Sequence, residues 1–198
     1  MTKTALSYSG GKDSSFALHK LQEQGIQVAC LITTIWEKSG ETVAHGEKRE
    51  RVKKQAEQLG IPLEFIVTDF QKYTNDFKVR LQEVKDAYQL DAIAYGDIYL
   101  EGHRKWGVDV AESVGLDALY PLWTKQELAI DLLYEYVEAG FKSKVIKVDE
   151  EKIPKNWVGR EVDAAFIRDI LKYDKVCPLG ESGEYHTYVY DGPIFQGN

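Results

Sequence analysis

Cysteine and long apolar runs are scarce in this chain. Only two cysteines occur among 198 residues, Cys30 and Cys177. They stand far apart and match no metal-ligand spacing, so neither a zinc site nor a disulfide framework is expected. No apolar run approaches the ~20 residues of a membrane-spanning helix, and an apolar strand pattern begins at once at Thr4. We therefore expect a cytoplasmic protein without a signal peptide or a membrane partner.

Excess positive charge is also missing. The formal net charge is −7, with 25 basic and 32 acidic residues. Basic residues gather only over residues 47–57, where glutamates interrupt them in the manner of a solvated helix face. Enzymes that act on nucleic acid usually carry a basic stripe. Nucleic acid is therefore not an expected partner.

Strand-like apolar runs alternate with helical patterns over the first 120 residues. Predicted strands span residues 4–7, 28–35, 63–67, 92–95 and 118–119. Helical spacing occurs between them, as at Phe77, Leu81, Val84 and Tyr88. This alternation predicts an α/β fold with a parallel sheet and right-handed crossovers. From residue 121 onward the rhythm changes to an α+β pattern, so we expect two units, 1–120 and 121–198.

The sequence Ser-Gly-Gly-Lys-Asp-Ser occupies residues 9–14, directly after the first predicted strand. Glycines let backbone N–H groups close around phosphate oxygens, and the following helix contributes the positive end of its dipole. Because Asp13 follows Lys12, this is not a Walker A loop. It looks like the PP-loop of ATP pyrophosphatases, which cleave ATP between its α and β phosphates. The alternative is an ordinary glycine-rich turn capped by Asp13 or Ser14.

The predicted nucleotide site includes the ends of neighbouring strands, because ligands of parallel sheets bind beyond their carboxyl ends. Thr33 and Gly96 lie at such ends. Asp97 follows as a metal, ribose or substrate contact, or as a plain turn residue. The predicted nucleotide-binding residues are Ser9, Gly10, Gly11, Lys12, Asp13, Ser14, Thr33 and Gly96.

A second motif lies near the end of the chain, where Glu181, Glu184 and His186 occur within six residues. Carboxylates in a turn that leads into a strand with a histidine can orient a nucleophile. In an extended segment Glu184 and His186 are expected to face the same side, and Tyr185 the other. The alternative is a polar hairpin turn on an edge strand.

The two motifs together resemble the diphthine–ammonia ligase family of PP-loop enzymes, over essentially the whole chain. Further matching segments are Ala44-His45-Gly46, Tyr95–Glu101, Pro121-Leu122-Trp123, Gly159-Arg160 and Asp191–Phe195. The resemblance implies an adenine-nucleotide α-hydrolase-like sheet, here residues 1–120, followed by a smaller substrate-binding region, here 121–198. It also implies a reaction: a carboxylate attacks the α-phosphate of ATP, pyrophosphate leaves, and ammonia displaces AMP.

This resemblance implies ATP and Mg²⁺ as cofactors, and ammonia or ammonium and a carboxylate acceptor as partners. Segments 45–46 and 97–101 are similar to the bacterial branch. Bacteria lack diphthamide, so the acceptor stays open between a small molecule and a protein side chain. The oligomeric state, a homo-oligomer included, also stays open.

Roles follow for individual residues. Lys12 would hold phosphate, Glu184 would bind ammonium, and His186 would accept a proton. Substrate binding would involve Asp97 and Glu181 as well as Glu184 and His186, and Asp13 is a candidate Mg²⁺ ligand. The competing functions are a tRNA-modifying PP-loop enzyme and a non-catalytic ATP-binding sensor.

Overall fold

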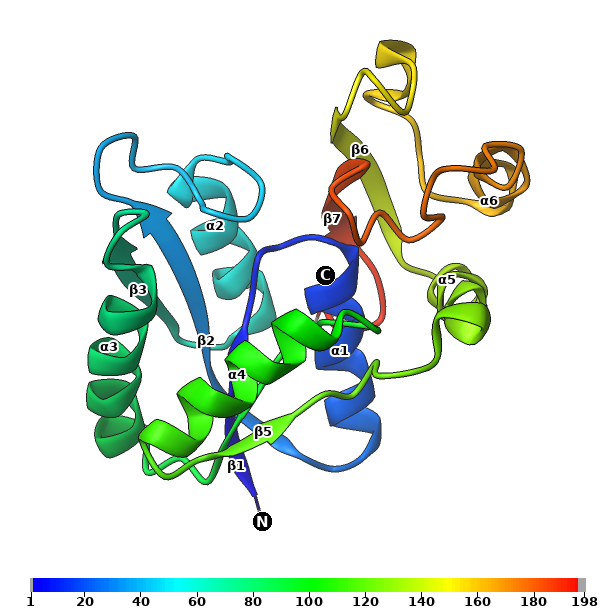
Figure 1. Cartoon of the computed structure of the whole chain (residues 1–198). Helices are drawn as coiled ribbons and strands as arrows, with labels where there is room; N and C mark the ends of the chain where they lie inside the picture. Colours follow the sequence, from blue (N-terminus) through cyan, green and yellow to red (C-terminus); the bar gives the residue numbers. More distant parts are fainter. Residues whose placement is uncertain (1, 196–198) are drawn as a thin grey trace.

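A five-stranded parallel sheet is built from the first 119 residues of the chain (Figure 1). The computed structural model describes residues 2–195, and every structural statement below refers to them. The strand order is β3-β2-β1-β4-β5. The strands are β1 (Lys3–Ser7), β2 (Gln27–Trp36), β3 (Leu63–Thr68), β4 (Ala92–Ala94) and β5 (Asp117–Leu119). All five predicted strands are confirmed, and so is the α/β class.

Helices cover both faces of this sheet, as the strand-to-strand crossovers require. The helices are α1 (Lys12–Glu23), α2 (Arg49–Leu59), α3 (Tyr73–Tyr88) and α4 (Glu101–Ser113). Apolar residues of α1 and α2 pack with Leu6 and Leu31 on one face. Those of α3 and α4 pack with Ala5 and Ile32 on the other. Adjacent strand residues thus serve opposite layers, which explains why the strands read as continuous apolar runs.

The rest of the chain forms a smaller α+β region. Its elements are η1 (Gln126–Leu128), α5 (Ala129–Glu138), β6 (Lys142–Val148), η2 (Lys155–Trp157), α6 (Ala164–Ile170) and β7 (Tyr185–Asp191). Strands β6 and β7 pair antiparallel. Along β7, Tyr185, Thr187 and Val189 are buried, which confirms the predicted alternation. Across residues 2–195, no helix combines the length and the apolar character that crossing a bilayer requires.

Strand β7 joins this smaller region to the loop that follows β1. The backbone N–H of Val189 donates to the Gly10 carbonyl at 3.1 Å, and the N–H of Lys12 donates to Thr187 Oγ1 at 2.9 Å. Buried Gln55 of α2 donates to the carbonyls of both Gly10 (3.0 Å) and Val189 (2.7 Å). One apolar core also runs from α1 and α2 into α5 and α6. The shape of the loop therefore depends on residues more than 170 positions away.

Candidate active site

A cavity of about 310 Å³ lies at the carboxyl ends of β1 and β4. The strand order reverses between these two strands, and ligands of open α/β sheets bind at such a reversal. The walls consist of residues 7–9, 13–14, 32–34, 42–45, 96–97 and 180–181, with Tyr73, His103 and His186. We call this space the nucleotide cavity. It combines residues from both ends of the chain.

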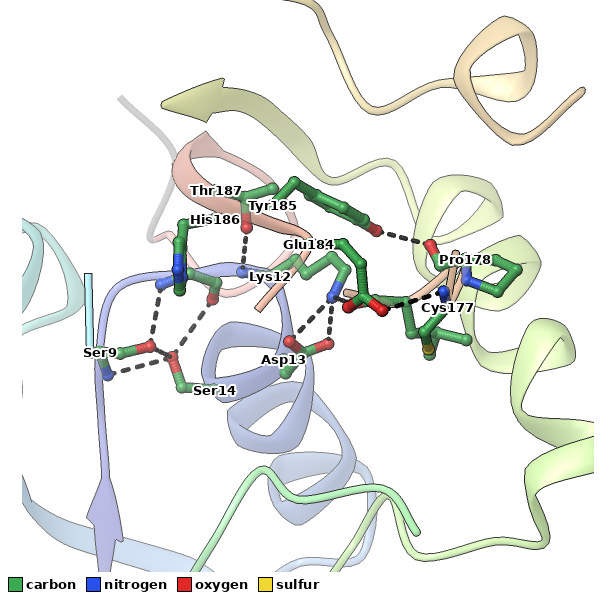
Figure 2. A network of polar contacts seen from close by, with 12 residues as sticks. Ser9, Lys12, Asp13, Ser14, Cys177, Pro178, Glu184, Tyr185, His186 and Thr187 are labelled. Carbon is green, nitrogen blue, oxygen red and sulfur yellow. Dashed lines mark hydrogen bonds and ion pairs between the residues drawn. The ribbon is translucent and has the colours of Figure 1, made fainter. Parts of the chain in front are cut away.

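The loop from Ser9 to Ser14 is closely packed around its glycines. Gly10 has φ +80°, and a Cβ there would come within 2.2 Å of Gln55 Oε1. A Cβ on Gly11 would lie 2.8 Å from His45 Nε2. The hydroxyls of Ser9 and Ser14 are 3.2 Å apart, and Ser14 Oγ also accepts the Ser9 N–H (Figure 2). The backbone conformation therefore requires glycine at position 10, and a side chain at position 11 would displace the His45 ring.

Thr33 and Gly96 both lie in the cavity wall, where the sequence places them. The Thr33 hydroxyl donates to the Tyr8 carbonyl and so connects β2 to the end of β1. A Cβ on Gly96 would lie 3.1 Å from the backbone N of Ser14. The end of β4 thus approaches the first turn of α1 closely, and a side chain at position 96 would press on the backbone of Asp13 and Ser14.

Lys12 is directed away from the nucleotide cavity. Its side chain is buried, and Nζ donates to both Asp13 carboxylate oxygens at 2.8 Å and to the Leu179 carbonyl. The ammonium also lies 5.2 Å from the centre of the Tyr185 ring. Figure 2 shows Lys12 extending toward the segment around Cys177, with His186 on the other side. Of the six loop residues, Ser9, Asp13 and Ser14 line the cavity, whereas Gly10, Gly11 and Lys12 lie behind its wall.

Three carboxylates line the nucleotide cavity: Asp13, Asp97 and Glu181. Burial, together with the nearby carboxylates of Asp13 and Asp97, raises the pKa of Glu181 to about 7, against the opposing effect of Lys12. Burial also raises the pKa of Asp97, whose carboxylate lies 3.0 Å from His103 Nδ1. Oxygen donors of this kind suit Mg²⁺. Within the part of the chain that the structure describes, however, no three potential ligands stand close enough to form a ready-made metal site.

Glu184 and His186 lie in different cavities, contrary to the expectation that they face the same side. Glu184 is buried and accepts a hydrogen bond from the backbone N–H of Cys177 at 3.2 Å (Figure 2). It accepts a second one from the N–H of Ser182 at 2.9 Å. It lines a second cavity of about 570 Å³, whereas His186 lines the nucleotide cavity. The alternation of a strand does not apply to Glu184, because β7 begins only at Tyr185 and the preceding Gly183 has φ +77°.

The second cavity lies on the other side of the turn that carries Glu181 and Glu184. Its polar lining includes Tyr99, Glu101, Cys177, Ser182 and Glu184. The Tyr99 hydroxyl lies 2.8 Å from Cys177 Sγ. Cys177 therefore belongs to a cavity wall, whereas the other cysteine, Cys30, is a fully buried residue of β2.

His45 is the main residue of the nucleotide cavity that was not among the predicted site residues. Its Nδ1 lies 2.8 Å from Nδ1 of His186, and the two rings meet edge to face. The sequence feature that could have indicated His45 was the segment Ala44-His45-Gly46, which matches the family. Its residue spacing alone does not indicate a catalytic or binding role. Only the fold brings it over Gly11, 34 positions earlier.

The fold and the cavity define a PP-loop protein with an adenine-nucleotide α-hydrolase-like sheet. Its fold is shared by a "predicted subunit of tRNA methyltransferase" from Methanocaldococcus jannaschii, with a TM-score of 0.52, 19% identity and 98% of each chain covered. At that level of identity the likeness concerns the fold alone.

Residues 2–118 match the diphthamide synthase N-terminal domain, and residues 129–198 match the diphthamide synthase C-terminal domain. The chain belongs to the diphthamide synthase family, which confirms the resemblance drawn from the motifs.

Curated relatives named diphthine–ammonia ligase occur in several eukaryotes. The protein from Danio rerio is 25% identical over 215 residues, covering 95% of this chain and 82% of the relative. The protein from Homo sapiens is 28% identical over 119 residues, covering 59% of this chain and 44% of the relative. The match therefore spans less than half of the human protein.

Proposed function

We propose that this protein is an ATP-dependent, amide-forming ligase that adenylates a carboxylate and amidates it with ammonia. The observation that supports this most directly is the nucleotide cavity, where the Ser9–Ser14 loop meets the end of β4 in a chain of the diphthamide synthase family. Carboxylate oxygen is a poor leaving group toward ammonia. Transfer of AMP to the carboxylate replaces it with a good leaving group.

Pyrophosphate departure would be favoured at this loop. The first backbone N–H groups of α1 lack intrahelical partners, and they carry the positive end of the helix dipole. The N–H of Lys12 is bound to Thr187 Oγ1, so the N–H groups of Asp13 and Ser14, residues that line the cavity, would stabilise the negative charge on the departing phosphates. Lys12, which is held behind the wall by Asp13 and Leu179, adds positive charge at short range.

Asp13 and Asp97 are the residues that would hold Mg²⁺ together with the phosphates of ATP. Their oxygens are the donors that this ion prefers, and a bound cation would relieve the repulsion among the cavity carboxylates. Mg²⁺ would supply charge neutralisation on the triphosphate.

The acceptor is expected beside the nucleotide cavity, toward residues 121–198. His186 lines this cavity, so it could accept the proton released when nitrogen attacks the acyl-adenylate. Glu181 is the carboxylate of the turn that faces the same space, where it could bind the acceptor or ammonium. Glu184, in the second cavity, is proposed to act on ammonium before it reaches the adenylate.

The two units would divide these tasks, with the nucleotide held mainly by residues 1–120 and the acceptor by 121–198. A truncation at residue 120 is a poor test, because it would expose the core that both units share. Point substitutions in the cavity walls on either side of the turn that carries Glu181 and Glu184 test the division without removing the core.

The decisive experiment measures AMP, pyrophosphate and amide separately, with ATP, ammonium and a panel of carboxylates that includes diphthine. One carboxylate should stimulate AMP release, with one amide formed per AMP. Release of ADP and phosphate instead would contradict the proposal. Stimulation by tRNA alone would favour the tRNA-modifying alternative, and ATP binding without any turnover would favour a sensor.

A further inference from the structure

His45 and His186 meet directly beside the loop predicted to hold phosphate. His45 comes from the segment between β2 and α2, and His186 from β7, so the contact joins the two units of the chain. A Cβ on Gly11 would lie 2.8 Å from His45 Nε2. This nitrogen therefore lies against the turn of the loop, and both imidazoles line the nucleotide cavity.

The hydrogen bond between the rings determines which nitrogens remain for a ligand. It joins the two Nδ1 atoms at 2.8 Å, so one proton lies between them and both Nε2 atoms are left over. In a neutral pair, the ring that carries the shared proton has a bare Nε2, and the other ring has an Nε2–H. Adding one proton turns both Nε2 atoms into donors and gives the pair a charge of +1.

Lys12 does not supply a positive hydrogen-bond donor to the nucleotide cavity. Its ammonium is engaged by Asp13 and the Leu179 carbonyl, and it does not line the cavity. The carboxylates of the cavity carry negative charge, which opposes a triphosphate. Positive hydrogen-bond donors beside the loop would therefore help to hold a phosphate group there, and His45 lies beside it.

We propose that His45 and His186 form an imidazole clamp that takes up one proton when ATP binds and donates from both Nε2 atoms to its phosphates. The proposal rests on the proposed function in taking ATP as the ligand. It assigns to His45 a role in phosphate binding, and to His186 a role before any proton transfer from ammonia.

The surroundings keep the pair neutral while the cavity is empty. Burial, together with His186, Lys12 and Lys147, lowers the pKa of His45 to about 3. Burial and Lys147 also lower the pKa of His186. The charged and titratable groups around the pair are Lys12 and Asp13 of α1, Lys147 of β6, Glu47 beside the His45 segment, and Asp97, His103 and Glu181 in the cavity. Phosphate oxygens would reverse this balance, because nearby negative charge favours the protonated form.

Two isosteric substitutions separate the two nitrogens of His45. In His45→Asn the amide nitrogen replaces Nδ1 and nothing replaces Nε2. In His45→Gln the amide nitrogen replaces Nε2, while the bond to His186 is lost. His19→Asn is the control, because His19 on α1 lies outside the cavity and pairs with Glu23.

Calorimetry with inorganic pyrophosphate, in two buffers of different ionisation enthalpy, gives affinity and proton uptake together. Wild type should take up more protons than His45→Asn on binding. Any change in the protonation of pyrophosphate itself contributes equally to both proteins and cancels in the difference. His45→Asn should bind pyrophosphate about tenfold more weakly, the loss of one charged hydrogen bond. His45→Gln should recover most of that affinity but not the proton uptake. Adenosine should bind all variants equally.

Equal proton uptake and equal pyrophosphate affinity in wild type and His45→Asn would overturn the clamp. A fall in thermal stability of both variants without loss of affinity would also overturn it, leaving the pair as a contact between units. If the variants do not fold, the pH dependence is measured in Glu181→Gln, because Glu181 lines the same cavity and its pKa of about 7 would otherwise mimic proton uptake by the pair. Between about pH 7.5 and 9 the charge of ATP no longer changes. Affinity should weaken with rising pH, and constant affinity would refute the proposal.

Failure of the proposed function gives a different result. Wild type would then form no amide from ATP, ammonium and any carboxylate of the panel, even where it binds ATP and pyrophosphate. If wild type forms amide and binds both, and His45 has no effect, only the clamp is wrong.

Discussion

The two cavities on either side of the turn from Gly180 to Glu184 differ in how their polar groups are satisfied. In the nucleotide cavity, Glu181 shares the space with Asp13 and Asp97 and has a raised pKa. In the second cavity, the Glu184 carboxylate accepts hydrogen bonds from the backbone N–H of Ser182 in this turn and of Cys177 before it. Two glutamates three residues apart thus have different physical states. The first is available to a ligand, whereas the second stabilises the turn that places the first.

Lys12 lies between the cavities, so its removal is expected to have the largest effect. Lys12→Ala would leave the Asp13 carboxylate without its partner. Breaking such a pair costs about 3 kcal/mol, at the lower end of the usual range because Asp13 is partly exposed. Urea unfolding measures this loss.

ATP and pyrophosphate binding should weaken in the same variant more than adenosine binding. Lys12→Arg is the matched control, since it keeps the positive charge but changes the shape of the group that contacts Asp13 and Leu179. Unchanged stability in Lys12→Ala would show that the buried contacts of the ammonium contribute nothing.

Gly96→Val should remove nucleotide binding while sparing the second cavity. Its side chain would meet the backbone at Ser14 and displace the first turn of α1. We expect at least a hundredfold loss of ATP affinity, about 2.7 kcal/mol. The alkylation rate of Cys177 reports on the second cavity, because Cys30 is fully buried. If Gly96→Val changed the alkylation rate of Cys177 by as large a factor as the ATP affinity, the two cavities would not be independent.

Glu184→Ala should give the opposite result. It leaves the N–H groups of Cys177 and Ser182 without an acceptor, at a cost of about 2 kcal/mol. Cys177 should then react faster, while ATP affinity changes little. Glu184→Gln retains an acceptor oxygen and should lose less stability. Equal losses in the two variants would indicate that the charge of Glu184, not its hydrogen bonds, is decisive.

The smallest effect is expected for Glu181→Gln, and it lies in the pH dependence of folding. The folded pKa of Glu181, about 7, exceeds its ordinary value of 4.5. The folded protein therefore binds more protons than the unfolded chain between about pH 4.5 and 7, and stability from this group falls as pH rises through that window. The whole shift in pKa corresponds to about 3 kcal/mol, but Glu181 is only partly buried and faces the open cavity, so solvent screening reduces the effect. Glu181→Gln should therefore flatten this part of the profile by about 1 kcal/mol, as measured by urea unfolding at several pH values without nucleotide. A profile identical to wild type would place Glu181 in solvent.

The sheet and its order of elements follow from sequence patterns because those patterns are local. Continuous apolar runs predict strands covered on both faces, and the Ser9–Ser14 motif marks the end of the first one. The alternation within β7 was also predicted correctly, since it depends only on a period of two. The same rule failed for Glu184 because this residue precedes the strand.

The sequence by itself determined the fold class, the strand-to-helix loop and the family of this protein. Tertiary structure decided which residues share a cavity. It turned Lys12 toward Asp13 and Leu179, placed His45 over Gly11, and put Glu181 and Glu184 on opposite sides of one turn. The physical reason is that patterns along the chain record the burial and conformation of each segment. Hydrogen bonds between Lys12 and Thr187, or between Gln55 and Val189, join positions more than a hundred residues apart, and no local pattern encodes them.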